Sequence, residues 1–480
     1  MTTTTVKRTY ASTPPPIRTS PSTSSKASLS IHTLTPTTTA TPSSIVPVIH
    51  TPGTPLSFLS TPMLLLSLLI TTCTSRPLLL RTSLAIFSLL ANAKSPLLSP
   101  DKNPLLRYLL KNTFYAQFCA GETPQEVRKT VRDLKDRGFR GVMMSFAREV
   151  VLKGKDADGA SRKSEMTKEE KERDITILRG WAQGNLDSIA VTEKGDMVAL
   201  KFSGAGMGVI GALARKEGPS KEAEKAIVEI CEAAFQKGVC LLFDAEQTTV
   251  QEGIDKWTLE FMKRYNGKVK GYACVYGTYQ AYLKSTPKTV AKHLAAARVG
   301  GYTLGVKLVR GAYLASDPRN LIWDTKEDTD KAFDSISEQL IRRRYGGILE
   351  ALDGEAAHDF PDVNLALASH NMLSVKKAMD IRKEQTQKGE QKIYMVYGQL
   401  MGMADEVSGE ILKAGRIVSQ EKGMLEEVPR AYKYLVWGTV SECMKYLLRR
   451  AEENRDAVGR TKDSQKALKE ELWKRVMRRV

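Results

Sequence analysis

Short apolar runs alternate with amphipathic helical patterns from Phe139 onward, and this alternation limits the possible fold more than any other feature of the chain. Repeated strand–helix units with buried strands build a parallel sheet. About eight such units in one stretch favour a closed (β/α)8 barrel over an open sheet. The predicted strands are 140–145, 197–203, 239–243, 272–275, 303–309, 363–369, 393–396 and 432–436. The predicted helices include 221–237, 254–265, 287–299, 326–344 and 374–384.

The N-terminal part of the chain differs in composition from the rest. Residues 1–54 are rich in Thr, Ser and Pro and contain no Asp or Glu, so we expect a disordered mitochondrial transit segment. Residues 55–95 are strongly apolar and are predicted to be helices that pack on the domain or touch a membrane. A membrane span within 55–73 is a weaker alternative because Pro62 interrupts it. The barrel domain is predicted to cover 96–480, with the charged stretch 153–173 as an exposed insertion.

Charge and ligand supply exclude several classes of function. The net charge is +18, but residues 1–100 hold seven Lys or Arg and no acid, so the remaining 380 residues carry only +11. That balance is ordinary for a soluble enzyme, and we expect no nucleic-acid partner. The six cysteines are scattered without a CxxC pair, and five histidines add no zinc spacing, so we expect no metal and a reducing compartment.

Chemistry in a barrel of this kind takes place at the C-terminal ends of the strands, where this chain has polar side chains. Each one alone has a structural explanation, such as a helix cap or an ion pair between Lys201 and Asp244. Polar residues at six strand ends are harder to explain in that way. The candidates are Lys201, Asp244, Gln280, Lys307 with Arg310 and Tyr313, Ser369 with His370 and Asn371, and Tyr434.

An arginine pair follows the last predicted strand. Thr439 and Glu442 have capping-box spacing, so a helix is expected to start there. On that helix Arg449 and Arg450 lie opposite the apolar face, and two guanidinium groups suit bidentate binding of a small carboxylate. A solvated charged face is the alternative explanation for the pair taken alone.

A glycine motif at 206–211 has the GxGxxG pattern of dinucleotide-binding proteins. The acid that binds the ribose should follow about 20 residues later at the end of the next strand. Here that strand-end acid is Asp244, 38 residues after Gly206. The motif therefore lacks the ribose-binding acid at the required spacing, and we expect no nicotinamide cofactor there.

With these residues in view, the chain resembles the proline dehydrogenase (proline oxidase) family in its eukaryotic mitochondrial form. The motifs that carry the resemblance are FCAGE at 118–122, FDAE at 243–246, QAY at 280–282, KLVRGAY at 307–313, SHN at 369–371, GQLMGM at 398–403 and YLLRRAEEN at 446–454. The resemblance implies a distorted (β/α)8 barrel that binds FAD noncovalently. It also implies oxidation of L-proline to Δ1-pyrroline-5-carboxylate by hydride transfer from C5 to flavin N5, with electrons passed to a quinone of the inner membrane, on its matrix side.

The resemblance also assigns roles to individual residues. Arg449, Arg450 and Lys201 would hold the proline carboxylate, and Tyr434 would pack against its ring. Lys201 would also pair with Asp244, close to substrate and flavin. The remaining residues implied to contact the cofactor are Ala245, Gln280, Lys307, Arg310, Gly311, Ala312, Ser369, His370 and, at the adenosine end, Glu453. Such cations position the carboxylate and favour a neutral amine, while the flavin supplies the redox chemistry.

One residue departs from the family pattern, and the roles of the C-terminal segment and the identity of the substrate have alternatives. Many bacterial members have Arg where this chain has Lys307, and a lysine donates as a point charge. The C-terminal segment 466–480 is amphipathic and basic, so it suits either an anionic membrane surface or docking onto the barrel. Hydroxyproline is an alternative substrate, since one hydroxyl separates it from proline. A membrane-associated binding protein without activity is the remaining alternative.

Overall fold

Eight parallel strands form a closed barrel in chain order, which confirms the predicted fold class. The computed structural model describes residues 54–92, 95–148, 167–314, 316–352, 359–420, 427–456 and 458–477. Residues 1–53, which the sequence assigns to a transit segment, lie outside the described part. The strands are β1 Gly141–Phe146, β2 Met197–Leu200, β3 Cys240–Phe243, β4 Val275–Gln280, β5 Leu304–Val309, β6 Val363–Ala368, β7 Tyr394–Leu400 and β8 Ala431–Trp437.

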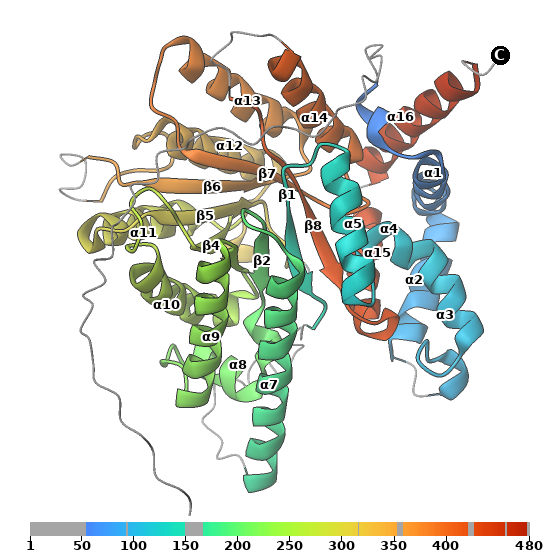
Figure 1. The fold of residues 1–480 in the computed structure, drawn as a ribbon, viewed down its shortest axis with the longest axis horizontal. Helices are drawn as coiled ribbons and strands as arrows, with labels where there is room; N and C mark the ends of the chain where they lie inside the picture. The colour runs from blue at the N-terminus through green and yellow to red at the C-terminus, as the bar shows by residue number, and fades with distance from the viewer. Residues whose placement is uncertain are drawn as a thin grey trace, which may run out of the picture. The chain divides into compact units, whose positions relative to one another are not determined.

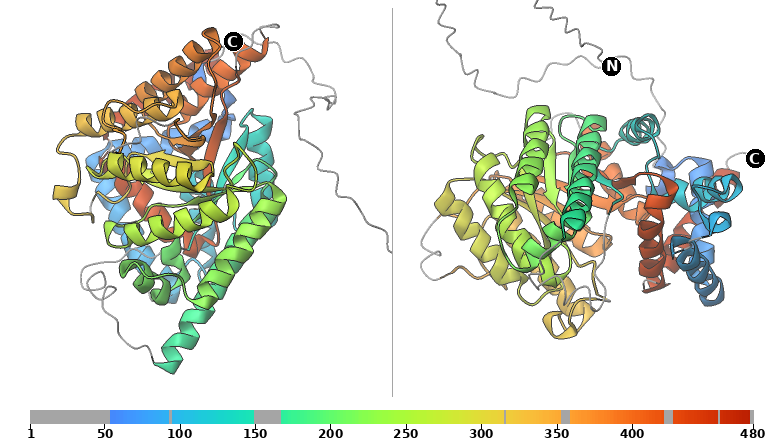
Figure 2. Two further views of the ribbon diagram at one scale, coloured as in Figure 1. Left: turned by 90° about the vertical axis from the view of Figure 1, so that its left-hand side faces the viewer. Right: turned by 90° about the horizontal axis from the view of Figure 1, so that it is seen from below.

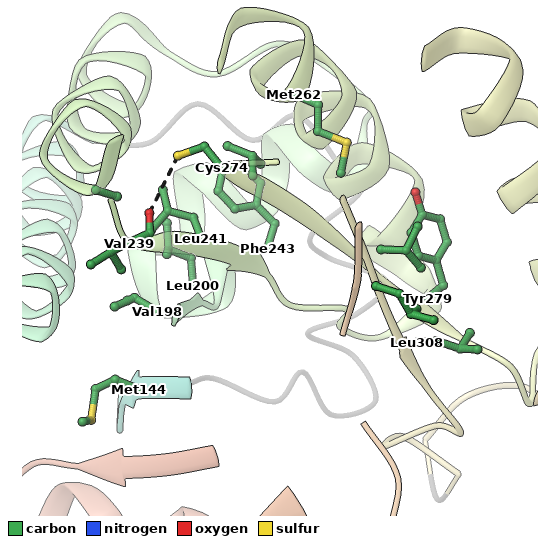
Figure 3. Packing of buried hydrophobic residues seen from close by; sticks show 14 of the residues in the cluster. Met144, Val198, Leu200, Val239, Leu241, Phe243, Met262, Cys274, Tyr279 and Leu308 are labelled. Carbon is green, nitrogen blue, oxygen red and sulfur yellow. Dashed lines mark hydrogen bonds between the residues drawn. The ribbon is translucent and has the colours of Figure 1, made fainter. Parts of the chain in front are cut away.

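Helices follow the strands and cover the outside of the barrel, as Figures 1 and 2 show. Those of the barrel region are α5 Pro124–Asp136, α7 Lys168–Val191, α8 Met207–Ala214, α9 Lys221–Lys237, α10 Thr248–Tyr265, α11 Thr286–Gly300, α12 Lys326–Arg342, α13 Met372–Gln387, α14 Asp405–Gln420 and α15 Val440–Asp456. Outward side chains of the strands, such as Phe243 and Leu308, pack against helix side chains such as Met262 of α10 (Figure 3). The burial of this apolar layer supplies the main driving force for folding.

Helices from both ends of the described chain pack together beside the barrel. The N-terminal helices are α1 Thr61–Ser75, α2 Pro77–Asn92, α3 Pro104–Leu110 and α4 Ala116–Phe118, and the last helix is α16 Val458–Met477. α1 lies against α16, and α2 lies against α15 (Figure 1). Single turns are η1 Pro55–Phe58, η2 Pro96–Leu98, η3 Lys111–Tyr115, η4 Phe202–Ala205 and η5 Arg319–Leu321.

Two strands run beyond their predicted ends at Val275 and Val396, and each contains a glycine. The predicted strands 272–275 and 393–396 were too early, because β4 runs from Val275 to Gln280 and β7 from Tyr394 to Leu400. A Cβ on Gly277 would lie 3.1 Å from a methyl of Thr258, and one on Gly398 would lie 3.0 Å from Met143. These glycines therefore mark close packing inside a strand. In contrast, β2 ends at Leu200, before the predicted end at 203.

The charged stretch predicted as an insertion is in part helical. Residues 153–166 lie outside the described part, but α7 begins at Lys168 and so includes the end of that stretch. Thr167 and Glu170 form a capping box, which gives the helix a stable start. The charges of 168–173 thus belong to the first turns of a barrel helix.

The glycine motif begins helix α8, but a carboxylate already lies at this helix N-terminus. The Gly208 N–H donates to Asp174 Oδ2 over 3.1 Å. Gly206 has φ of +112°, where a side chain is strained, and a Cβ there would lie 2.4 Å from Asp174. A dinucleotide phosphate at this position would meet a negative charge, so the glycines are explained by the close approach of α7.

None of the helices in the described ranges is by itself long and apolar enough to cross a bilayer. α1 and the apolar part of α2 pass the hydropathy criterion only together, and they bend by 101° at the break between them. In this structure several of their apolar side chains, among them Leu64, Ile70 and Phe87, are buried in the protein.

Asn266, at the end of α10, ties the start of β4 to the start of β5, and we predict that its loss destabilises the fold. Its side chain is buried, donates to the carbonyls of Val275 and Thr303, and accepts from the N–H groups of Cys274 and Val275. Asn266→Ala leaves these backbone groups unpaired, at about 1–3 kcal/mol each. Urea unfolding should show a loss of at least about 3 kcal/mol, whereas Asn112→Ala, at an exposed side chain, should lose less than about 1 kcal/mol. Equal losses would contradict this assignment.

Candidate active site

Asp244, Lys307 and Tyr434 meet at the C-terminal end of the barrel. Asp244 follows β3, Lys307 is on β5 and Tyr434 is on β8. Lys307 Nζ lies 2.5 Å from Asp244 Oδ1, and the Tyr434 hydroxyl donates to Asp244 Oδ2 over 2.9 Å. Their exposed fractions are only 7%, 5% and 8%. The structure therefore brings together three of the residues that the sequence analysis selected from separate strands.

The electrostatics of this cluster keep Tyr434 protonated. Burial, followed by the charge of Asp244 and the nearby Tyr446, raises the pKa of Tyr434 well above its usual value. The Lys307 ammonium also lies 4.9 Å from the centre of the Tyr434 ring, in a cation–π arrangement. Tyr434 is thus a fixed hydrogen-bond donor to Asp244, with its ring face next to a cation.

Gln280, at the end of β4, orients the chain that follows β5. Its Oε1 accepts from the Ala312 N–H over 3.0 Å, and its Nε2 donates to the Glu246 carbonyl over 3.3 Å. A Cβ on Gly311 would lie 2.5 Å from the ring of Tyr282, so the backbone approaches that ring as only glycine allows. Ala245, the residue after Asp244, is half-buried at the same end.

Arg310 is held between β5 and β6 by several contacts. Its guanidinium donates to Asp330 and to the hydroxyls of Ser369 and Ser374, and stacks 4.3 Å from the Phe333 ring. Among the described residues these contacts use three of its five N–H donors. Arg310 is thus rigid and has donors that can serve an anionic ligand.

The SHN motif joins β6 to α13. Asn371 caps α13 by accepting from the N–H groups of Leu373 and Ser374. His370 Nε2 accepts from the Leu400 N–H over 3.1 Å, so the neutral ring carries its proton on Nδ1. This contact also connects SHN with the GQLMGM motif on β7.

The arginine pair is not a solvated charged face. Arg450 is buried, with an exposed fraction of 5%, and its guanidinium lies 4.8 Å from the centre of the Tyr446 ring. Arg449 is half-buried, and its guanidinium lies 5.9 Å from the ring of Tyr313, in the segment after β5. The predicted capping box is present, since Thr439 and Glu442 exchange both hydrogen bonds.

The start of the arginine helix is held by residues that precede the barrel. Tyr115 donates its hydroxyl to the Gly438 carbonyl over 2.6 Å, and Glu122 accepts from the Val440 N–H at the start of α15. Glu122 is in turn bound by Arg107 and Lys111. The FCAGE motif therefore positions α15, a role that the sequence analysis did not assign.

Two further predicted site residues are Lys201 and Glu453. Lys201 lies one residue past β2, half-buried, and its carbonyl accepts from the Trp181 indole over 2.8 Å. The contacts that define Asp244 come from Lys307 and Tyr434, so its pairing with Lys201 stays a prediction. Glu453 is on α15, but its side chain lies outside the described part.

Comparison with known proteins decides the family. A family model described as proline dehydrogenase matches residues 127–463. The chain belongs to the proline dehydrogenase family. The probable mitochondrial proline dehydrogenase of Schizosaccharomyces pombe is 31% identical over 420 residues, which cover 78% of this chain and 81% of that protein. This proline dehydrogenase-family chain is thus an oxidoreductase of the eukaryotic mitochondrial type.

Two further comparisons concern the substrate and the fold. Hydroxyproline dehydrogenase of Mus musculus is 29% identical over 414 residues, covering 78% of this chain and 84% of that protein. The structure of proline utilization A from Bdellovibrio bacteriovorus superposes with a TM-score of 0.56 at 15% identity. It covers 80% of this proline dehydrogenase-family chain, which spans only 38% of that longer protein, so this likeness concerns the fold.

The Asp244–Lys307 pair should behave as a buried ion pair whose members depend on each other. Asp244→Asn leaves a buried ammonium without its counter-charge, and we expect a loss of about 3–5 kcal/mol in urea unfolding. Adding Lys307→Met should recover part of that loss. The exposed pair Lys216–Glu252 is a matched control, because Glu252→Gln should change stability by less than about 1 kcal/mol. Strict additivity of the two buried substitutions would contradict the coupling.

Proposed function

We propose that this chain oxidises L-proline to Δ1-pyrroline-5-carboxylate with noncovalently bound FAD, as the first step of proline breakdown. The observation that carries the proposal is the buried Asp244–Lys307–Tyr434 cluster beside a helix whose Arg450 is also buried. Buried charges of this kind are costly for folding, so their presence at a strand end supports a site that uses them. The family match supports the reaction class.

The residues at this end of the barrel fit FAD. The hydroxyl of Thr278 on β4 is buried without a hydrogen-bond partner in the described part of the chain, as expected where a polar ligand completes the site. Gln280 and Lys307 would hold the flavin ring, with Asp244 and Ala245 close to it. The residues that would hold the dinucleotide part are Arg310, Gly311, Ala312, Ser369 and His370, with Glu453 at the adenosine end. When bound, FAD supplies the acceptor for the hydride that leaves C5 of proline.

The chain itself would bind and orient proline. Arg449 and Arg450, with Lys201, would hold the carboxylate, which fixes C5 relative to the rest of the site. The Tyr434 ring would pack against the five-membered ring of the substrate. The same cations disfavour a charged amine, so the bound nitrogen would lose its proton, and its lone pair would then favour departure of the hydride from C5.

Hydroxyproline is a second candidate substrate. Its support is the likeness to hydroxyproline dehydrogenase of Mus musculus over 78% of this chain, a share equal to that matched by the Schizosaccharomyces pombe protein. An added hydroxyl requires a polar partner in the pocket, and without one the site gains little from it. A comparison of kcat/KM for the two substrates on one preparation decides between them.

We also propose that the electrons pass to a membrane quinone, with the enzyme on the matrix side of the mitochondrial inner membrane. The helices beside the barrel support a peripheral membrane contact. They expose Leu65 and Leu69 on α1, Leu79, Ile86 and Leu89 on α2, Leu105, Tyr108 and Leu109 on α3, and Trp473, Val476 and Met477 on α16. No acid occurs in residues 1–100, which suits an anionic surface. The helix α16 packs on α1 through Leu468, bonds the barrel helix α14 through Ser464 and Glu406 over 3.0 Å, and still exposes Trp473.

An anaerobic titration with proline tests the proposed reaction. Protein purified with FAD should lose its flavin absorbance as proline is added, and Arg449→Ala should lower kcat/KM about 10- to 150-fold, since one charge-assisted hydrogen bond contributes about 1.5–3 kcal/mol. Arg416→Ala, at an exposed arginine of α14, should have no effect. A preparation without flavin, or flavin that proline leaves oxidised, would refute the proposal.

Vesicle binding tests the membrane contact. Leu65 and Leu69 are 49% and 56% exposed and one helical turn apart. Changing both to Gln should weaken sedimentation with anionic vesicles at least about tenfold, because each leucine transferred into lipid contributes about 1.5–3 kcal/mol when fully buried. Leu373→Gln, at an exposed leucine of α13, is the control. Oxidation of proline with a soluble dye should remain unchanged in both variants, and equal vesicle binding would contradict the assigned surface.

A further inference from the structure

Thr278 has a buried hydroxyl that the described fold does not use. Its side chain lies on β4 with an exposed fraction of 6%, and Oγ1 has no hydrogen-bond partner in the described ranges. Leaving such a group unpaired costs about 1–3 kcal/mol. A valine has almost the same shape and would avoid that cost. The hydroxyl at this position therefore calls for an explanation outside the folding of the barrel.

Register places Thr278 between the two members of the buried ion pair. Phe243 on β3 pairs with Gly277, so Asp244 and Thr278 follow at the next position. Thr278 in turn pairs with Lys307 on β5. The Asp244–Lys307 contact thus joins residues on either side of β4, at the register position of Thr278. The three side chains occupy neighbouring positions around one ring of the barrel interior.

The other side chains of β4 show which way Thr278 points. Tyr279 faces outward, where its hydroxyl contacts His293 of α11 over 2.7 Å. Successive side chains alternate between the two faces of a strand, so Thr278 lies on the inner face, together with Gln280. Gln280 contacts the segment after β5, whereas Tyr276 lies deeper, in the cluster with Cys240. Thr278 is therefore at the level of the site.

The ion pair does not bond the hydroxyl in this arrangement. Asp244 Oδ1 accepts from Lys307, and Oδ2 accepts from Tyr434. Thr278 takes part in neither hydrogen bond, although it pairs with Lys307 in the register of β4 and β5. Its donor is thus available to a ligand bound above the pair.

We propose that the Thr278 hydroxyl donates a hydrogen bond to the isoalloxazine ring of bound FAD and so positions the ring over the Asp244–Lys307 pair. This inference rests on the proposed function. The ring carries carbonyl oxygens and unprotonated nitrogens, which are acceptors for such a donor. Thr278 acts through the cofactor and is a positioning residue. The hydrogen bond explains why the chain keeps a hydroxyl where valine would serve the fold.

The proposal predicts that loss of the Thr278 hydroxyl does not lower the stability of the flavin-free protein but weakens the binding of FAD. Thr278→Val should leave the melting temperature of the flavin-free protein unchanged or higher, because it removes an unpaired polar group. The same variant should bind FAD about three- to tenfold more weakly in a fluorescence titration, as expected for one hydrogen bond. The visible absorption band of the bound flavin should shift in Thr278→Val, and Thr278→Ser should restore both affinity and spectrum.

Thr258→Val is a matched control with the reverse pattern. Thr258 is buried on α10 and donates to the Ile254 carbonyl over 2.7 Å, so its hydroxyl is used within the helix. Its replacement leaves FAD affinity and the flavin spectrum unchanged and does not raise the melting temperature. The pair of variants thus separates a hydroxyl that serves the fold from one that serves the ligand.

Each outcome decides the matter. Weaker FAD binding by Thr278→Val, rescued by Thr278→Ser, supports the proposal. Unchanged affinity and spectrum in a preparation that proline still reduces overturn it and leave the proposed function intact. A lower melting temperature of flavin-free Thr278→Val also overturns it, because the hydroxyl would then stabilise the fold. If the unmodified protein binds no flavin, the proposed function and this inference fail together.

Discussion

Closure of the barrel between β8 and β1 is the constraint on which the site depends. This pairing runs over six residue pairs, and Val436 of β8, which pairs with Ser145 of β1, also forms a separate bridge with Cys119. It places the end of β8, and with it the start of α15, next to the segment that carries Tyr115 and Glu122. A helix whose first turn is held in this way has a defined direction, so Arg449 and Arg450 are brought to the same end of the barrel as Asp244.

The ion pair between Asp244 and Lys307 determines the character of that end. Two opposite charges at 2.5 Å, both buried, are stable only because each carboxylate oxygen has a donor. The pair connects β3 with β5 over β4, and Tyr434 connects it with β8. Side chains from three of the eight strands thus converge on one carboxylate. A ligand bound here would meet a rigid surface, since moving any one of these side chains leaves a buried charge unpaired.

Much of this arrangement was predictable from the sequence because buried parallel strands are short, apolar and regularly spaced. Asp244 and Tyr434 were found by their places at strand ends, and the capping box at Thr439 marked the start of α15. The partner of Asp244 was less accessible, because pairing across a barrel depends on register, and the ends of β4 and β7 were predicted too early, at Val275 and Val396. The same error hid Thr278, although the alternation of Tyr276, Thr278 and Gln280 contains the signal. Contacts from α2, α3 and the FCAGE segment could not be predicted, since nothing local specifies which helix faces α15.

The packing of the first described helices on the last ones has a kinetic consequence. Thr54 bonds Glu471, 417 residues away, and α1 and α2 complete their burial only against α16 and α15. Contacts of such sequence separation form late, because the whole intervening chain must first be synthesised and ordered. The apolar N-terminal helices emerge first and wait longest for their partners. During that interval the apolar side chains of these helices are exposed and prone to aggregation, so a holding chaperone would act on residues 55–92 before the barrel closes.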